Sequence, residues 1–338
     1  GIDLGANIDY NDKIKIGIAI NAFDKMNSSR NICGVYSIES KLNNSTFFNQ
    51  KMERLDFSTN RYVNHHVDYY SHKLRRQNFH KTFIYGENKL PIYDKIQNNG
   101  ILNIQSNSIS KLKFTIKDFK GNTSSLSFNI TGNSIQKIKP STVPKFTKKL
   151  KHKDSNYFDT TNFTLIMGEN CLYQDLNFKY KTRKNKYYLS DIHSIHNKFT
   201  AVHNYYKLII KSNKNLDSTL NSKLLIVQID GKKVSAKGGT FTPEGSITTR
   251  VRKFGNFAIA IDTVSPIVNL ITNKTVFTSQ SIIKFKISDD LAGIEIPFPI
   301  RTLALDQSDK KNPSDVSDYF DRGSLGLLLY AECRLSPR

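Results

Sequence analysis

Histidines are the side chains of this sequence best suited to bind a metal ion, and the densest group is His65, His66 and Asp68. On a strand, His66 and Asp68 would share a face, whereas on a helix His65 would approach Asp68 or the later His72. Either arrangement would suit a zinc ion. We favour a polar surface loop whose histidines contact water or nearby tyrosines, and we keep His65, His66 and Asp68 as an alternative metal site.

The remaining motifs do not indicate an active site. His193 and His196 are three residues apart and His203 follows, but the chain has no HExxH sequence. It also has no GxSxG elbow, no glycine loop followed by GK[ST], and no CxxC pair among Cys33, Cys171 and Cys333. We therefore assign no catalytic residue and expect no cofactor in this chain.

One segment mixes cations with tyrosines and could contact an anionic polymer. Such a segment can lie along phosphates and stack bases on its rings. The alternative, which we favour, is a solvated loop in a lysine-rich chain, so we expect no specific nucleic acid partner. The binding candidates are Lys179, Lys181, Arg183, Lys184, Lys186, Tyr187 and Tyr188.

Period-2 alternation is the strongest structural signal and predicts half-buried strands. It appears in residues 14–20, 111–117, 125–130, 206–210, 257–261 and 283–287. Asp118–Asn122 joins two of these strands as a hairpin, and Asp230-Gly231 supplies a second hairpin turn. Helical spacing occurs only in residues 61–76, where one short helix and an irregular loop are equally compatible with the sequence. The sequence thus predicts an all-β chain of tandem immunoglobulin-like β-sandwich domains, the last one incomplete.

Composition places the expected boundaries. The first sandwich covers residues 1–131, with a long insertion near 55–100, and a basic linker covers 132–155. The second sandwich covers 156–262, and residues 263–294 begin a third, truncated one. No apolar stretch is long enough to cross a bilayer.

The last residues differ from the rest in charge. The 338-residue chain has a net charge of +21, but residues 295–338 hold 6 basic and 7 acidic residues. Lysine and asparagine almost vanish there, and the alternation stops. We expect an atypical tail, caused by a change of reading frame or a mis-joined gene end. The alternative is a divergent, disordered tail.

Residues 10–131 also carry motifs of a known family. The pieces are Ile18–Asp24, Gly34–Ile38, Phe57–Asn64 with Asp68-Tyr69, Leu90–Tyr93 and Ile116–Asn122. In this order they resemble the region after the catalytic domain in bacterial envelope zinc endopeptidases of the lysostaphin type, which are peptidoglycan hydrolases with immunoglobulin-like β domains. The resemblance is looser over residues 155–294 and absent after 294.

The resemblance implies a function for the parent protein but no active site in this chain. The zinc ligands of the family lie in HxxxD and HxH motifs, and neither occurs here. We therefore expect non-catalytic accessory domains of a metallopeptidase, cut after the catalytic domain, with zinc held only by that missing domain. The implied location is the bacterial envelope, periplasmic or secreted, and the implied partners are wall polymer or an envelope protein. The alternative is a surface adhesin or carbohydrate-binding module unrelated to a peptidase.

Overall fold

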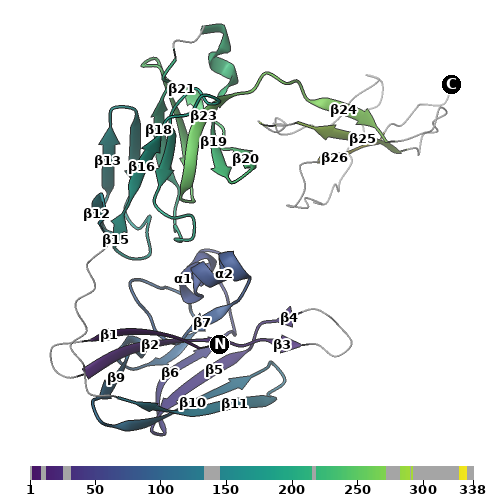
Figure 1. Cartoon of the computed structure of the whole chain (residues 1–338). Coiled ribbons are helices and arrows are strands. Elements are labelled where there is room, and N and C mark those ends of the chain that lie inside the picture. The colour runs from purple at the N-terminus through teal and green to yellow at the C-terminus, as the bar shows by residue number, and fades with distance from the viewer. Residues whose placement is uncertain are drawn as a thin grey trace. The chain divides into compact units, whose positions relative to one another are not determined.

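The computed structural model describes residues 2–8, 13–25, 32–132, 145–214, 218–271, 282–289, 291 and 327–332. The chain has an all-β, multi-domain sandwich fold built from antiparallel sheets, as its alternation predicts (Figure 1). Within these residues, no helix is both long and apolar enough to span a bilayer.

The chain divides into two compact units. The first contains residues 1–181, 194–208 and 250–255, and the second contains residues 182–193, 209–249 and 256–338. The N-terminal sandwich and its insertion lie entirely in the first unit.

Two sheets form the N-terminal sandwich (Figure 1). The first sheet runs β1 (Ile2–Ile8), β2 (Lys13–Asn21) and β7 (Phe79–Lys81), with β9 (Leu102–Gln105) also paired to β2. The second runs β11 (Thr123–Thr131), β10 (Ile109–Lys117), β5 (Ser37–Leu42), β6 (Ser45–Lys51) and β8 (Tyr93–Ile96). A short ribbon pairs β3 (Asp24–Lys25) with β4 (Ile32–Cys33).

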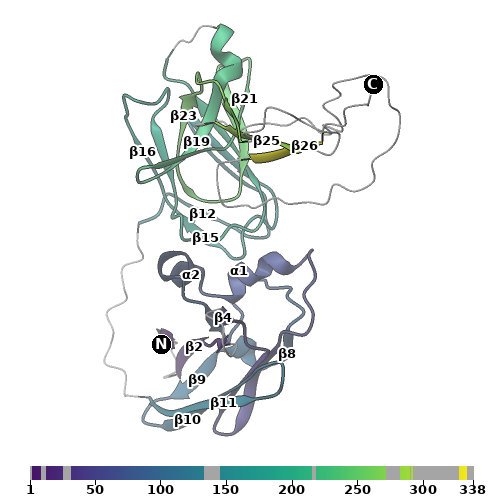
Figure 2. The ribbon, with the colours of Figure 1, turned by 90° about the vertical axis from the view of Figure 1, so that its right-hand side faces the viewer.

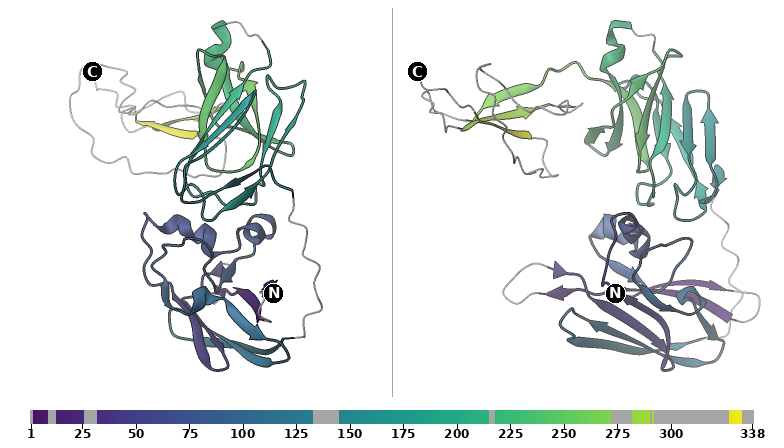
Figure 3. Two further views of the ribbon diagram at one scale, coloured as in Figure 1. Left: turned by 90° about the vertical axis from the view of Figure 1, so that its left-hand side faces the viewer. Right: turned by 180° about the vertical axis from the view of Figure 1, so that it is seen from behind.

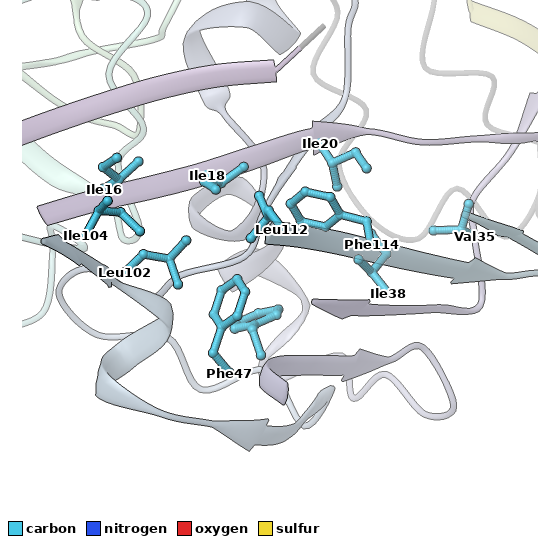
Figure 4. Close-up of a cluster of buried hydrophobic side chains, with 11 residues drawn as sticks. Ile16, Ile18, Ile20, Val35, Ile38, Phe47, Leu102, Ile104, Leu112 and Phe114 are labelled. Atoms are coloured by element: carbon cyan, nitrogen blue, oxygen red, sulfur yellow. The ribbon is translucent and has the colours of Figure 1, made fainter. Parts of the chain in front are cut away.

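The core of this sandwich lies between the two sheets (Figure 4). Ile16, Ile18 and Ile20 alternate along β2 and are nearly fully buried. They meet side chains of the facing sheet, because every second residue of a strand points to the same side. The buried cluster comprises Ile16, Ile18, Ile20, Val35, Ile38, Phe47, Phe48, Leu102, Ile104, Leu112 and Phe114.

Residues 52–92, which we call the insertion, connect β6 to β8. They contain the short helix η1 (Asn60–Tyr62), α1 (Val63–His66), α2 (Tyr69–Arg75) and strand β7. The sequence was equally compatible with one short helix or an irregular loop in residues 61–76. The structure has two short α-helices there. A further short helix, η2 (Asn98–Gly100), lies between β8 and β9.

Residues 145–262 form a second group of strands (Figures 2 and 3). One five-stranded sheet runs β13 (Asn156–Thr160), β14 (Phe163–Met167), β18 (Tyr206–Lys211), β22 (Ser246–Val251) and β21 (Thr240–Phe241). The other runs β16 (Tyr180–Arg183), β17 (Ile192–Ile195), β23 (Gly255–Ile261), β19 (Leu224–Asp230) and β20 (Lys233–Ala236). The short helix η3 (Ser218–Lys223) precedes β19.

The end of the expected linker differs from the sequence-based expectation. Within the expected linker 132–155, Lys148–Leu150 form strand β12, which pairs with β15 (Leu176–Phe178). Leu150 is fully buried, so its apolar side chain belongs to a folded module. Residues 133–144 of that linker lie outside the described residues.

The last sheet pairs β24 (Ile267–Leu270), β25 (Ile282–Ser288) and β26 (Leu327–Glu332). All four residues of β24 are exposed. β26 falls within the tail that we expected to stand apart, and the rest of residues 295–338 lies outside the described residues.

The packing of the N-terminal core predicts a large effect for one substitution. We expect Phe114→Ala to destabilise the N-terminal sandwich by about 3–5 kcal/mol, because the fully buried ring leaves a cavity. Phe57→Ala is the matched control, since Phe57 is 93% exposed. Urea denaturation followed by far-UV circular dichroism measures both variants. Equal midpoints for the two would contradict the assigned core.

Candidate functional site

The basic segment proposed from the sequence lies on a sheet edge. Tyr180–Arg183 form β16, the edge strand of its sheet, and the candidates after Arg183 lie in the loop that follows. All five cations of the candidate set are exposed, and Tyr187 is 79% exposed while Tyr188 is half-buried. Lys186 lies over the Tyr187 ring, with its Nζ 5.3 Å from the ring centroid. Lysines on an edge strand also discourage edge-to-edge pairing with another chain.

The three residues of the alternative metal site point to different partners. His65 donates from Nε2 to the carbonyl of Tyr85 and stacks on Tyr173, with ring centroids 5.1 Å apart. The Asp68 carboxylate accepts from the backbone N–H of Ser71 at 3.0 Å and caps α2. Among the described residues, no group of three or more His, Cys, Asp or Glu side chains is arranged to hold a metal ion.

His66 instead joins a buried pair with His80. Its Nε2 lies 3.2 Å from Nδ1 of His80, and its Nδ1 lies 3.2 Å from the hydroxyl of Tyr93. Only 1% of His66 and 9% of His80 is exposed. Burial lowers the pKa of His66 to about 3, with smaller contributions from His80, Lys81 and His65, and burial also lowers the pKa of His80. Both rings are therefore neutral at pH 7, and the pair is a structural hydrogen bond.

The second histidine group does not converge either. His193 is buried in β17, and burial lowers its pKa to about 4. The His196 ring packs on Phe178 and Phe254, and burial lowers its pKa to about 4 as well. His203 belongs to the aromatic cluster described next.

Aromatic rings from three distant segments meet in the first unit, and we call Tyr62, Tyr173 and His203 the aromatic joint. The centroid distances are 5.8 Å for Tyr62–Tyr173, 4.5 Å for Tyr62–His203 and 4.9 Å for Tyr173–His203. Tyr62 and Tyr173 are buried together with Leu90 and Ile92, and His203 is half-buried beside them. Burying a large apolar side chain contributes about 1.5–3 kcal/mol, so these contacts outweigh the exposed ion pairs of the chain.

Arg61 binds the backbone beside the aromatic joint. Its Nε donates to the carbonyl of His203 at 3.0 Å, and its Nη2 donates to the carbonyl of Val202 at 3.3 Å. In return, the hydroxyl of Tyr173 donates to the carbonyl of Arg61 at 2.6 Å. These two neighbouring carbonyls lie in a loop and have no strand partner, so the planar guanidinium supplies their hydrogen-bond donors.

Gly86 allows a further backbone contact at the same place. Its φ of +75° lies in the left-handed region, and a Cβ there would collide with the carbonyl of Tyr173. The next residue, Glu87, donates its N–H to that same carbonyl at 3.1 Å. A glycine is required for this approach.

Sequence reasoning placed Arg61 and Tyr62 in a family motif and grouped His203 with His193 and His196, but it missed that Tyr173 and His203 meet Tyr62. These two residues lie more than 100 positions away in loops without a recognisable pattern. The arrangement as a whole binds segments together, and it contains no nucleophile paired with a base.

Comparison with known proteins gives one partial match. Residues 147–262 are similar to a Zu5-like domain, which is about a third of the chain. The match ends where we placed the end of the second sandwich, at residue 262, and begins just before β12. No curated protein and no solved structure matches the chain.

The hydrogen bonds of Arg61 predict a specific loss of stability. We expect Arg61→Ala to lower the free energy of unfolding by about 2 kcal/mol, because two partly buried carbonyls lose their charged donor. It should also speed proteolysis in residues 171–173 and 200–205. Arg54→Ala is the matched control, because Arg54 is exposed in the same insertion. Equal unfolding and proteolysis of the two variants would argue against the contact.

The neutral pair of His66 and His80 predicts sensitivity to acid. The folded-state pKa of His66 lies near 3, below the ordinary 6.5, so the unfolded chain takes up a proton first as the pH falls. The contribution of the neutral ring to the free energy of unfolding is therefore fully present above pH 6.5 and is lost toward pH 3. For each such histidine, the loss is at most ~1.4 kcal/mol for each pH unit. We expect the urea midpoint to fall between pH 7.5 and pH 5.

A variant pair assigns this acid sensitivity. His66→Gln removes one titrating group and should flatten the dependence of the urea midpoint on pH. His72→Gln should keep the full dependence, because the His72 side chain is solvent-accessible and bonded to Asn78 on the surface. The same slope in the two variants would show that His66 is not the group responsible.

Proposed function

We propose that this chain is the non-catalytic β-sandwich region of a lysostaphin-type zinc endopeptidase that acts on peptidoglycan. Its work in the bacterial envelope, periplasmic or secreted, is to position the catalytic domain and to contact wall polymer or an envelope protein. Zinc belongs to the catalytic domain of the parent protein, and no residue of this chain is given a catalytic role.

The observation that carries the proposal is how the family-like motifs are used. Phe57–Asn64 supplies Tyr62, and Leu90–Tyr93 supplies Leu90 and Ile92, to the buried cluster around Tyr173. Arg61, from the first of these motifs, donates to the His203 carbonyl beside the cluster. Both motifs therefore contribute to one contact between distant segments of the chain, and this supports a positioning role.

Two further motifs, Gly34–Ile38 and Ile116–Asn122, contact each other within the N-terminal sandwich. Tyr36, from the motif Gly34–Ile38, contacts Phe119 edge-on at 5.7 Å between centroids. Phe119 lies in the hairpin turn that Asp118 stabilises by accepting from the Asn122 N–H at 2.8 Å. Motifs that are separate in sequence therefore serve one sandwich, which supports a resemblance of fold and not a chance collection of short matches.

The parent protein can be tested by its gene. We predict that the genomic sequence on the 5′ side of this reading frame, in the same frame, encodes a domain with HxxxD and HxH motifs. The test is to sequence both DNA strands of the gene on both sides of this segment and to translate the natural reading frame. An adjoining sequence without the two motifs would overturn the peptidase assignment and leave the adhesin or carbohydrate-binding alternative.

The non-catalytic role has its own biochemical test. The chain incubated with purified sacculi and zinc should release no soluble sugar or peptide, whereas an active lysostaphin-type enzyme should release them under the same conditions. Release by this chain alone would contradict the assignment, because it would require an active site within these residues.

A further inference from the structure

The outer face of β10 and its neighbours concentrates lysines. Along β10, Lys111, Lys113 and Lys117 are exposed, whereas the alternating Leu112 and Phe114 are buried in the core. Strand residues two apart are separated by about 6.8 Å, which is the spacing of Lys111 and Lys113, and Lys117 lies about twice as far along the same face. The three lysines therefore form a row of positive charge.

The neighbouring strands extend this surface with small polar side chains and one more lysine. On β11, Asn129, Ser127 and Thr123 stand opposite the three lysines of β10. On β5, Lys41 stands opposite Lys113. We call Lys41, Lys111, Lys113 and Lys117, with the facing residues of β11, the lysine face.

Acidic side chains compensate only part of this charge. Lys41 pairs with Glu39 at 3.1 Å. Among the described residues, no carboxylate forms an ion pair with Lys111 or Lys113. Like charges directly opposite on adjacent strands are destabilising, so the pairing of Lys113 with Lys41 is not explained by the stability of the sheet.

The lysine face is open and lies away from the insertion. The β10–β11 hairpin lies on the opposite side of the N-terminal sandwich from α1 and α2 in each view (Figures 1 and 2). On β11, Ser125 and Ser127 are also exposed. A long, flexible partner can therefore lie across the strands.

We propose that the lysine face binds a linear acidic polysaccharide. Ammonium groups attract its carboxylates, while the Ser, Thr and Asn side chains of β11 can hydrogen-bond sugar hydroxyls. A single strand of nucleic acid fits less well, because the β11 residues opposite the lysines are Asn129, Ser127 and Thr123, none of which can stack on a base. The inference deepens the proposed function, since it names the class of wall polymer that the accessory region would contact.

Two triple variants of the full chain distinguish binding by the lysine face from binding that depends only on the net charge. Lys111→Gln, Lys113→Gln and Lys117→Gln remove three charges from the lysine face. Lys207→Gln, Lys232→Gln and Lys233→Gln remove three exposed charges elsewhere, so both variants change the net charge of +21 by the same amount. Polygalacturonate is the probe, with neutral dextran and single-stranded DNA as comparisons, and the dissociation constants are measured at several salt concentrations.

We expect the face variant to bind polygalacturonate at least 10-fold more weakly and the control variant to change less than 2-fold. The dependence of log affinity on log salt concentration should also become shallower only in the face variant, because fewer counterions are released. Equal losses in both variants, or no loss in either, would overturn the inference. Tighter, face-dependent binding of single-stranded DNA would overturn the choice of polysaccharide.

Carbodiimide coupling on the unchanged protein provides a second readout that does not depend on how the variants fold. It joins lysine Nζ to polymer carboxylates as amides, and mass spectrometry then locates the modified lysines. We expect Lys111, Lys113 and Lys117 to be coupled preferentially, and uniform coupling over all exposed lysines would contradict a defined face. The gene sequence tests the peptidase parent separately, so failure of either proposal can be recognised without the other.

Discussion

The guanidinium of Arg61 is the group on which the described arrangement of the first unit depends most. It satisfies the carbonyls of Val202 and His203, while the neighbouring Tyr62 packs against Tyr173 and His203. Backbone carbonyls in a loop have no strand partner, so their burial is costly unless a side chain donates to them. One arginine therefore makes it possible to bury the aromatic joint next to polar backbone.

Burial has a second consequence in the same insertion. His66 and His80 are neutral because desolvation disfavours the imidazolium, and each then has a ring nitrogen free to accept a hydrogen bond. The pair can thus share one N–H and bond Tyr93 without a charge in the core. Of the three residues considered for zinc, only His66 takes part in this contact, which connects the insertion to β8 through Tyr93. The exposed lysines of β10 keep their positive charge on the outer face of the sheet.

The sequence predicts much of the fold because its strands have one apolar and one polar face. Alternation located β2, β10, β11, β18, β23 and β25, and the Asp118 and Asp230 turns followed from local residue preferences. Strand β12 was missed, because three residues among lysines give no periodicity. The aromatic joint was also missed, because Tyr173 and His203 meet Tyr62 only through tertiary contacts that no local pattern encodes. The lysine face needed the register of β10 with β5 and β11 before its charges could be placed together.

Hydrogen exchange at Glu87 tests the aromatic joint most directly. The N–H of Glu87 donates to the carbonyl of Tyr173, so its protection reports whether the insertion and the Tyr173 loop form one cooperative unit. If they do, Glu87 should exchange as slowly as the central amides of β10 in the intact chain. Exchange as fast as that of the exposed residues Phe119 and Lys120 in the hairpin turn would contradict the account.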